Sequence, residues 1–105
     1  MRQTIQTHKT DYDGNPAGGD TVGTGFAIVW QEGPLGVGTS RMAPNGACVE
    51  EVIEAALGRL AFYQASKFRC RENALAITKL EEALHWLDHR TRDRERRGVE
   101  GTHGL

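Results

Sequence analysis

Apolar residues recur every three or four positions along two stretches in the second half of the chain, and this spacing predicts two helices. The first helix is expected at about 48–65, with an apolar stripe made of Val49, Val52, Ile53, Ala56, Leu60 and Tyr63. The second is expected at about 71–97, with a stripe made of Ala76, Ile77, Leu80, Ala83, Leu84 and Leu87. Gly98 follows as a stop signal, because glycine readily adopts the backbone conformation that ends a helix.

The first half of the chain has the alternating pattern of a small sheet. In TGFAIVW, residues 24–30, larger apolar side chains alternate with smaller ones, which predicts a strand. A turn at 31–34 and a returning segment at 35–40 predict an antiparallel hairpin. Residues 1–20 are polar and contain the breaker cluster DGNPAGGD, so we expect a loosely ordered arm with one strand near 4–10.

These elements predict an α+β fold, in which a small antiparallel sheet precedes two long helices within one domain at 21–105. The second helix is too long to be covered by one hairpin and one shorter helix. We therefore expect its far half to pack against another copy of the chain.

Composition narrows the class of protein. The formal net charge is −1, whereas a general nucleic-acid binder carries a positive excess. Cys48 and Cys70 stand alone, as reduced thiols do in a cytosolic protein. The start of the chain has no apolar signal-peptide core, and its longest apolar run, FAIVW, is far too short to span a membrane. The expectation is a soluble, intracellular protein.

Five arginines lie within RTRDRERR, residues 90–97, and helical geometry separates them. At about 100° per residue, Arg94 lies about 20° from Leu87 and Arg90 about 60° from it, so both extend the apolar stripe. The outward set is neutralised by acids three or four positions away, as Arg92 is by Asp88. This outward set consists of Arg92, Arg96 and Arg97.

The positions three and four residues from Arg94 hold no acid, and Arg90 has only the shared Asp93, with Trp86 one turn back for a cation–π contact. Placing such charges at the edge of a buried face is costly without a counter-ion. Two interpretations stay open. A carboxylate from elsewhere pairs with these arginines, or an anionic ligand binds them, since a guanidinium suits phosphate.

Three other residues have both a structural and a ligand-binding interpretation. Asn73 can cap the second helix or occupy its first turn, or its amide can recognise a base or ribose edge. Phe62 and Tyr63 can be core aromatics, or they can stack on a nucleobase.

Neither a metal site nor a catalytic site is expected. His85 and His89 are one turn apart, but no third ligand is evident beyond Asp88 or His103, and metal sites need three or four ligands. No nucleophile–base pair can be argued, and no cofactor is indicated, so a binding protein is favoured over an enzyme.

Two segments resemble a known family. The runs RENALAITKLEEALHWLDHRTRDRERRGVEGT, 71–102, and NG-x-x-x-EEV-I-E-A-x-L-x-RL-x-FY, 45–63, are similar to phage anti-Thoeris proteins, the first-described family of Thoeris signal sponges. The most specific part is RT-x-x-R-x-x-RGVEGT. The resemblance begins at the FAIVW run and does not cover the arm at 1–20.

The resemblance implies a phage protein, acting in the cytoplasm of the infected bacterium, that binds cyclic ADP-ribose isomers without cleaving them. It implies dimers that assemble into hexamers, with pockets at the dimer interface. By motif, Arg90 and Arg94 correspond to the phosphate-binding arginines, Asn73 to the family's asparagine, and Tyr63, with Phe62 adjacent, to its aromatic residue.

Some members also bind cyclic oligonucleotides of the CBASS system at a separate site, for which Arg41 is the candidate here. The rival interpretation is a small oligomeric nucleic-acid-binding protein that uses the basic end of the second helix.

Overall fold

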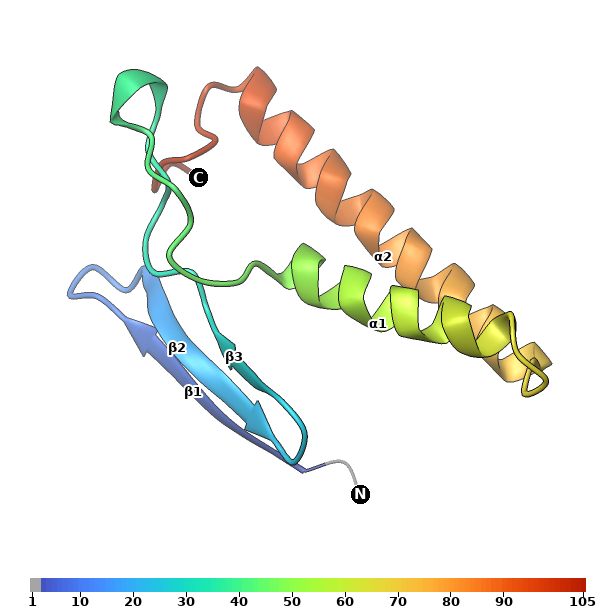
Figure 1. Ribbon diagram of the computed structural model, residues 1–105. Coiled ribbons are helices and arrows are strands. Elements are labelled where there is room, and N and C mark those ends of the chain that lie inside the picture. Colours follow the sequence, from blue (N-terminus) through green and yellow to red (C-terminus); the bar gives the residue numbers. More distant parts are fainter. Residues whose placement is uncertain (1–2) are drawn as a thin grey trace. The chain divides into compact units, whose positions relative to one another are not determined.

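The computed structural model describes residues 3–105, so Met1 and Arg2 of the predicted arm lie outside the described residues. The chain forms two compact units (Figure 1). The sheet unit contains the chain up to Cys48 together with Arg97–Leu105, and the helical unit is Val49–Arg96. The predicted α+β class, an antiparallel sheet followed by two helices, is confirmed.

The sheet has three antiparallel strands in the order β1 (Thr4–Thr10), β2 (Pro16–Gly23) and β3 (Ala27–Val29). The predicted strand at 4–10 is confirmed, and the strand predicted at 24–30 is shorter. The expected hairpin with 35–40 is wrong, because β3 pairs with β2 instead. Gly36 and Gly38 have φ values of 90° and 58°, which break an extended strand, and Gly38–Ser40 forms a 3₁₀ turn.

Strand β2 includes the last five residues of the DGNPAGGD segment, whose composition had predicted a break in the chain rather than a strand. The carboxylate of Asp11 accepts hydrogen bonds from the backbone N–H groups of Asp13 and Asn15, both at 2.9 Å, and so closes the turn between β1 and β2. These hydrogen bonds, led by that from the Asn15 backbone, hold the pKa of Asp11 below its ordinary value. Gly19 pairs closely with β1, since an added Cβ would lie 2.0 Å from the Thr7 carbonyl oxygen.

A polar network fixes the sheet unit beyond its strands. Thr21 on β2 is 6% exposed, and its hydroxyl accepts a 2.9 Å hydrogen bond from the Trp30 indole Nε1. Asn45 clamps the chain after β3, because its Oδ1 accepts from the Glu32 N–H at 2.8 Å and its Nδ2 donates to the Glu32 carbonyl at 3.1 Å. Side-chain hydrogen bonds therefore help to stabilise the sheet unit, as a large apolar core does in bigger domains.

The helical unit is an antiparallel pair, α1 (Val49–Gln64) and α2 (Arg71–Arg96), as the apolar spacing predicted (Figure 1). Gln64 closes the connection by bonding both the N–H and the carbonyl of Cys70, at 3.1 and 3.0 Å. α2 has 26 residues and α1 has 16, so the end of α2 runs past α1. Gly98, with φ of 72°, follows the helix as expected.

The apolar stripes of α1 and α2 meet but do not bury each other fully. Across the residues that the structure describes, no hydrophobic side chain is buried, and Leu80, Leu84 and Leu87 are only half-buried. A protein this small has little other apolar surface with which to stabilise its fold. No helix within residues 3–105 is long and apolar enough to cross a membrane.

Candidate ligand-binding site

The end of α1 presents two aromatic rings to solvent. Phe62 is 60% exposed and Tyr63 is 39% exposed, and their ring centroids lie 6.0 Å apart at an interplanar angle of 56°. Neither ring is a core residue of this chain, which removes the structural interpretation of the pair within one subunit. Exposed faces of this kind are the surfaces on which nucleobases stack.

Asn73 lies in the first turn of α2 but does not cap the helix. The cap position belongs to Cys70, whose Sγ accepts a hydrogen bond from the Asn73 backbone N–H at 3.4 Å. Within residues 3–105 the side-chain amide of Asn73 makes no hydrogen bond, and the residue is half-buried. A partly desolvated amide with open donors and acceptors suits recognition of a polar ligand edge.

Arg90 and Arg94 lie near the other end of α2. Arg94 is half-buried, as its place beside the apolar stripe predicted, whereas Arg90 is exposed. No carboxylate of the described chain forms an ion pair with Arg90. Arg94 stands in the last turn of α2, where a cation also complements the negative end of the helix dipole.

The cation–π contact expected between Arg90 and Trp86 is not formed among the described residues. The indole of Trp86 meets the imidazoles of His85 and His89 edge-on instead, with centroid distances of 6.4 and 6.0 Å. Trp86 therefore contacts the histidines one position before it and three positions after it, and not Arg90 four positions after it. Three or more His, Cys, Asp or Glu side chains do not gather anywhere in residues 3–105 as a metal site would require.

Two of the three outward arginines, Arg92 and Arg96, behave as helix-surface residues, whereas Arg97 follows the last residue of α2 and donates a hydrogen bond to the Leu105 carbonyl at 2.8 Å. Arg92 pairs with Asp88 at 2.9 Å and Arg96 with Asp93 at 3.4 Å, as their spacing predicted. An open hollow of about 620 Å³ lies beside this face and is lined by His89, Arg92, Glu95 and Arg96. Since α2 supplies all of these lining residues, the hollow is a feature of one helix surface.

The predicted ligand-binding residues fall into two groups that one chain does not bring together. The first group, Phe62, Tyr63 and Asn73, lies at the α1–α2 connection, and the second, Arg90 and Arg94, lies toward the far end of α2. Seventeen residues separate Asn73 from Arg90 on a continuous helix, which is about 25 Å at 1.5 Å per residue. A mononucleotide-sized ligand cannot span that distance.

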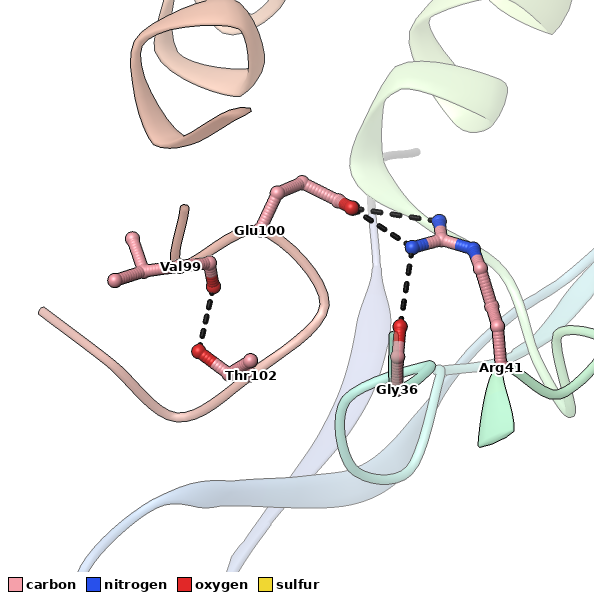
Figure 2. A network of polar contacts seen from close by, with 5 residues as sticks. All are labelled: Gly36, Arg41, Val99, Glu100 and Thr102. Atoms are coloured by element: carbon pink, nitrogen blue, oxygen red, sulfur yellow. Dashed lines mark hydrogen bonds and ion pairs between the residues drawn. The ribbon is translucent and has the colours of Figure 1, made fainter. Parts of the chain in front are cut away.

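Arg41, the candidate for a second site, has a carboxylate partner in the sheet unit. Its guanidinium donates to both carboxylate oxygens of Glu100, at 2.7 and 3.3 Å, and to the Gly36 carbonyl at 3.2 Å (Figure 2). The Gly36 N–H donates in turn to the Gly101 carbonyl at 2.8 Å. An anion binding at Arg41 therefore has to compete with Glu100.

One further cation at the aromatic group escaped the sequence analysis. The Arg59 guanidinium carbon lies 4.9 Å from the Phe62 ring centroid and 4.8 Å from that of Tyr63. The signal was present, because Phe62 and Tyr63 stand three and four residues after Arg59. Like Arg94, Arg59 has no acid three or four positions away on its helix.

Comparison with known proteins places the chain in a family. Residues 24–92 match the model of the Acb2/Tad1 hairpin domain. The chain belongs to the Acb2/Tad1 hairpin-domain family. The match includes Phe62, Tyr63, Asn73 and Arg90 and ends two residues before Arg94.

A curated relative supports the same family assignment. The protein "Thoeris anti-defense 1" of Bacillus phage SBSphiJ7 is 49% identical over 84 residues, which are 80% of this chain and 56% of the relative. The resemblance to phage anti-Thoeris proteins is thereby confirmed for this Acb2/Tad1 hairpin-domain chain. The aligned part is little more than half of the relative's length.

Proposed function

We propose that this protein is a phage anti-defence protein that binds and sequesters cyclic ADP-ribose isomers, the messengers of bacterial Thoeris immunity, without cleaving them. The name of the phage relative supports an anti-Thoeris role. The chain offers the groups that such a ligand requires, namely two exposed rings, the half-buried amide of Asn73 and the guanidinium groups of Arg90 and Arg94. By this proposal it acts in the cytoplasm of the infected host.

The observation that carries the proposal is the separation of the two residue groups along α2. Two copies arranged antiparallel about a two-fold axis bring the aromatic end of one copy to the arginine end of the other. Each dimer then has two equivalent composite sites, and each site draws on both subunits. The half-buried stripes of α1 and α2 supply apolar surface for this contact, and association of three such dimers produces the proposed hexamer.

The residues of the proposed composite site contact different parts of the ligand. Tyr63 or Phe62 stacks on the adenine, and Asn73 hydrogen-bonds a polar edge of the base or ribose. From the other subunit, Arg90 and Arg94 hold the diphosphate through charge-assisted hydrogen bonds. Such a site needs no nucleophile or general base, because sequestration leaves every ligand bond intact. Arg41 is the proposed residue of a second site for CBASS cyclic oligonucleotides.

Subunit mixing tests the composite site directly. The first variant combines Arg90→Ala and Arg94→Ala, and the second combines Tyr63→Ala and Asn73→Ala. Each variant alone should lose binding of a Thoeris-derived cyclic ADP-ribose isomer by calorimetry, with a loss of at least about 1.5–3 kcal/mol for each charge-assisted hydrogen bond removed.

After the two variants are unfolded together and refolded, a mixed dimer contains one intact site and one doubly damaged site. Statistical pairing puts half of the dimers in this class, so about one quarter of wild-type sites should return with wild-type affinity. Recovery of no sites, although native mass spectrometry shows mixed dimers, excludes a site shared between subunits. The same residues binding within one chain would give that result.

Retention of the ligand tests sequestration against catalysis. The protein is incubated with lysate from a messenger-producing strain, washed, heat-denatured and analysed by mass spectrometry. An intact cyclic nucleotide in the released fraction supports a sponge, and a linear product identifies an enzyme.

A further inference from the structure

The contact between Arg59 and the two exposed rings has no role in the site proposed so far. Its guanidinium carbon lies 4.9 and 4.8 Å from the centroids of Phe62 and Tyr63, so it touches both rings. Arg59 is itself exposed. The three side chains form one cluster on the last two turns of α1.

No carboxylate accounts for the position of this arginine. Its neighbours toward the start of α1 are Ala55 and Ala56, and toward the end they are the two aromatic residues. Within the part of the chain that the structure describes, Arg59 forms no ion pair. An exposed cation–π contact contributes little to folding, so stability alone is a weak reason for the arrangement.

The surrounding connection between the helices has the same character. Lys67 Nζ lies 5.3 Å from the Phe68 ring centroid, and Phe68 is 70% exposed. Residues 59–72 hold four cations and one acid, against a whole-chain formal charge of −1, and these charged residues are Arg59, Lys67, Arg69, Arg71 and Glu72. Cations beside exposed rings fit a ligand that carries both a base and a phosphate.

We propose that Arg59 is a further ligand-binding residue, which donates hydrogen bonds to a phosphate of a nucleotide whose base stacks on Phe62 or Tyr63. This inference rests on the proposed function and adds a third guanidinium, contributed by the subunit that supplies the rings. Contact with both rings also limits their rotation before the ligand arrives, which lowers the entropic cost of binding. A guanidinium serves better than an ammonium here, because its planar fork contacts rings while its N–H groups bind phosphate.

Calorimetry on the full-length oligomer with a Thoeris-derived cyclic ADP-ribose isomer tests the proposal. Arg59→Ala should weaken binding roughly tenfold or more, the scale of one charge-assisted hydrogen bond. Arg59→Lys, which keeps the charge without the fork, should be intermediate. The matched control is Arg92→Ala, which removes the same group from the outward face of α2 and should stay within about twofold of wild type on the scale of exposed ion pairs.

Salt dependence separates a phosphate contact from a purely structural effect. Affinity of Arg59→Ala should fall less steeply with added salt than that of wild type, because one charge–charge contact is gone. An equal salt dependence, or an affinity like that of Arg92→Ala, overturns the role of Arg59. Circular dichroism and light scattering check folding and assembly, and Arg59→Gln, which keeps a polar side chain of intermediate length, replaces Arg59→Ala if that variant unfolds.

The failures of the two proposals are distinguishable. If wild type binds and Arg94→Ala does not, while Arg59→Ala binds like wild type, the inference on Arg59 alone is wrong. If wild type itself fails to bind the cyclic ADP-ribose isomer, the proposed function fails and the role of Arg59 fails with it.

Discussion

In the sheet unit, polar side chains join segments that are far apart in sequence, whereas in the helical unit they mostly pair with neighbours one turn away. Arg41 and Glu100 are 59 positions apart, and Asn45 binds Glu32 across 13 positions. On α2, ion pairs join Lys79 with Glu82, Asp88 with Arg92 and Asp93 with Arg96, which are three, four and three positions apart. Long-range polar contacts define the shape of the first unit, and apolar stripes define the second.

This difference shows where assembly and ligand binding are expected. The sheet unit satisfies its polar groups internally through specific partners such as Thr21 with Trp30. The helical unit keeps half-buried leucines along its stripes and exposes Phe62 and Tyr63 at its tip. Apolar and cationic surface groups are those that a second copy and an anionic ligand would contact, so the helical unit is where we propose both.

The largest effect is expected from a charge placed in the stripe of α2. Leu80→Glu puts a carboxylate among half-buried apolar side chains, which costs on the order of several kcal/mol without a partner. We expect loss of the proposed oligomer by light scattering, and with it loss of ligand binding, because the proposed composite site draws on two copies.

Thr78→Glu is the matched control for that charge. Thr78 is exposed and lies about 160° around the helix from Leu80, so the same charge stays in water. Assembly should survive in this variant. An oligomer that persists in Leu80→Glu would show that α2 is not the contact between copies.

The two helices could be predicted from the sequence more fully than the three-stranded sheet. Regular apolar spacing over many turns defined α1 and α2 to within one residue at each end, because packing and periodicity agree there. Strand β2 was missed because its glycines resemble breakers. Gly19 is required instead for the close approach to Thr7, a contact that depends on a partner strand rather than on local sequence.

In the candidate site, too, positions on a helix could be predicted, whereas contacts between distant segments could not. Helix register alone placed Arg94 beside the stripe and the outward arginines on the surface, as the structure has them. The pairing of Arg41 with Glu100 could not be predicted, since it depends on how the end of the chain returns to the 36–41 loop. The role of Cys70 as helix cap was also missed, because a thiol is a weaker acceptor than the asparagine side chain considered for it.

A smaller effect is expected from breaking the longest-range pair of the sheet unit. Glu100→Gln removes the charge that holds Arg41, and because both side chains are partly exposed, at 29% and 42%, the loss of stability should be below about 1 kcal/mol. Thermal unfolding followed by circular dichroism measures it. The Gly36 amide, which bonds Gly101, should exchange hydrogen faster.

The same variant sharpens the proposal for Arg41. If Arg41 also binds a cyclic oligonucleotide, removing its competing carboxylate should tighten binding of a cyclic trinucleotide, and Arg41→Ala should weaken it. Unchanged trinucleotide affinity in both variants would leave Arg41 with a structural role only.

The smallest effect is expected at the turn between β1 and β2, where the stabilising contacts are local and exposed. The backbone hydrogen bond from Asn15, with those from the Asn15 side chain and the Asp13 backbone, lowers the pKa of Asp11 in the folded state. The folded state therefore binds this proton less readily than the unfolded state. The stabilisation is present above the unfolded pKa of 3.8 and is lost as the pH falls through the folded value.

Asp11→Asn should melt slightly below wild type at pH 7, and the difference should vanish in acid. Asp13→Asn, two positions away, should not reproduce this pH dependence, since none of the described hydrogen bonds ends on its carboxylate. A difference that persists unchanged at low pH would show that the Asp11 charge does not hold the turn.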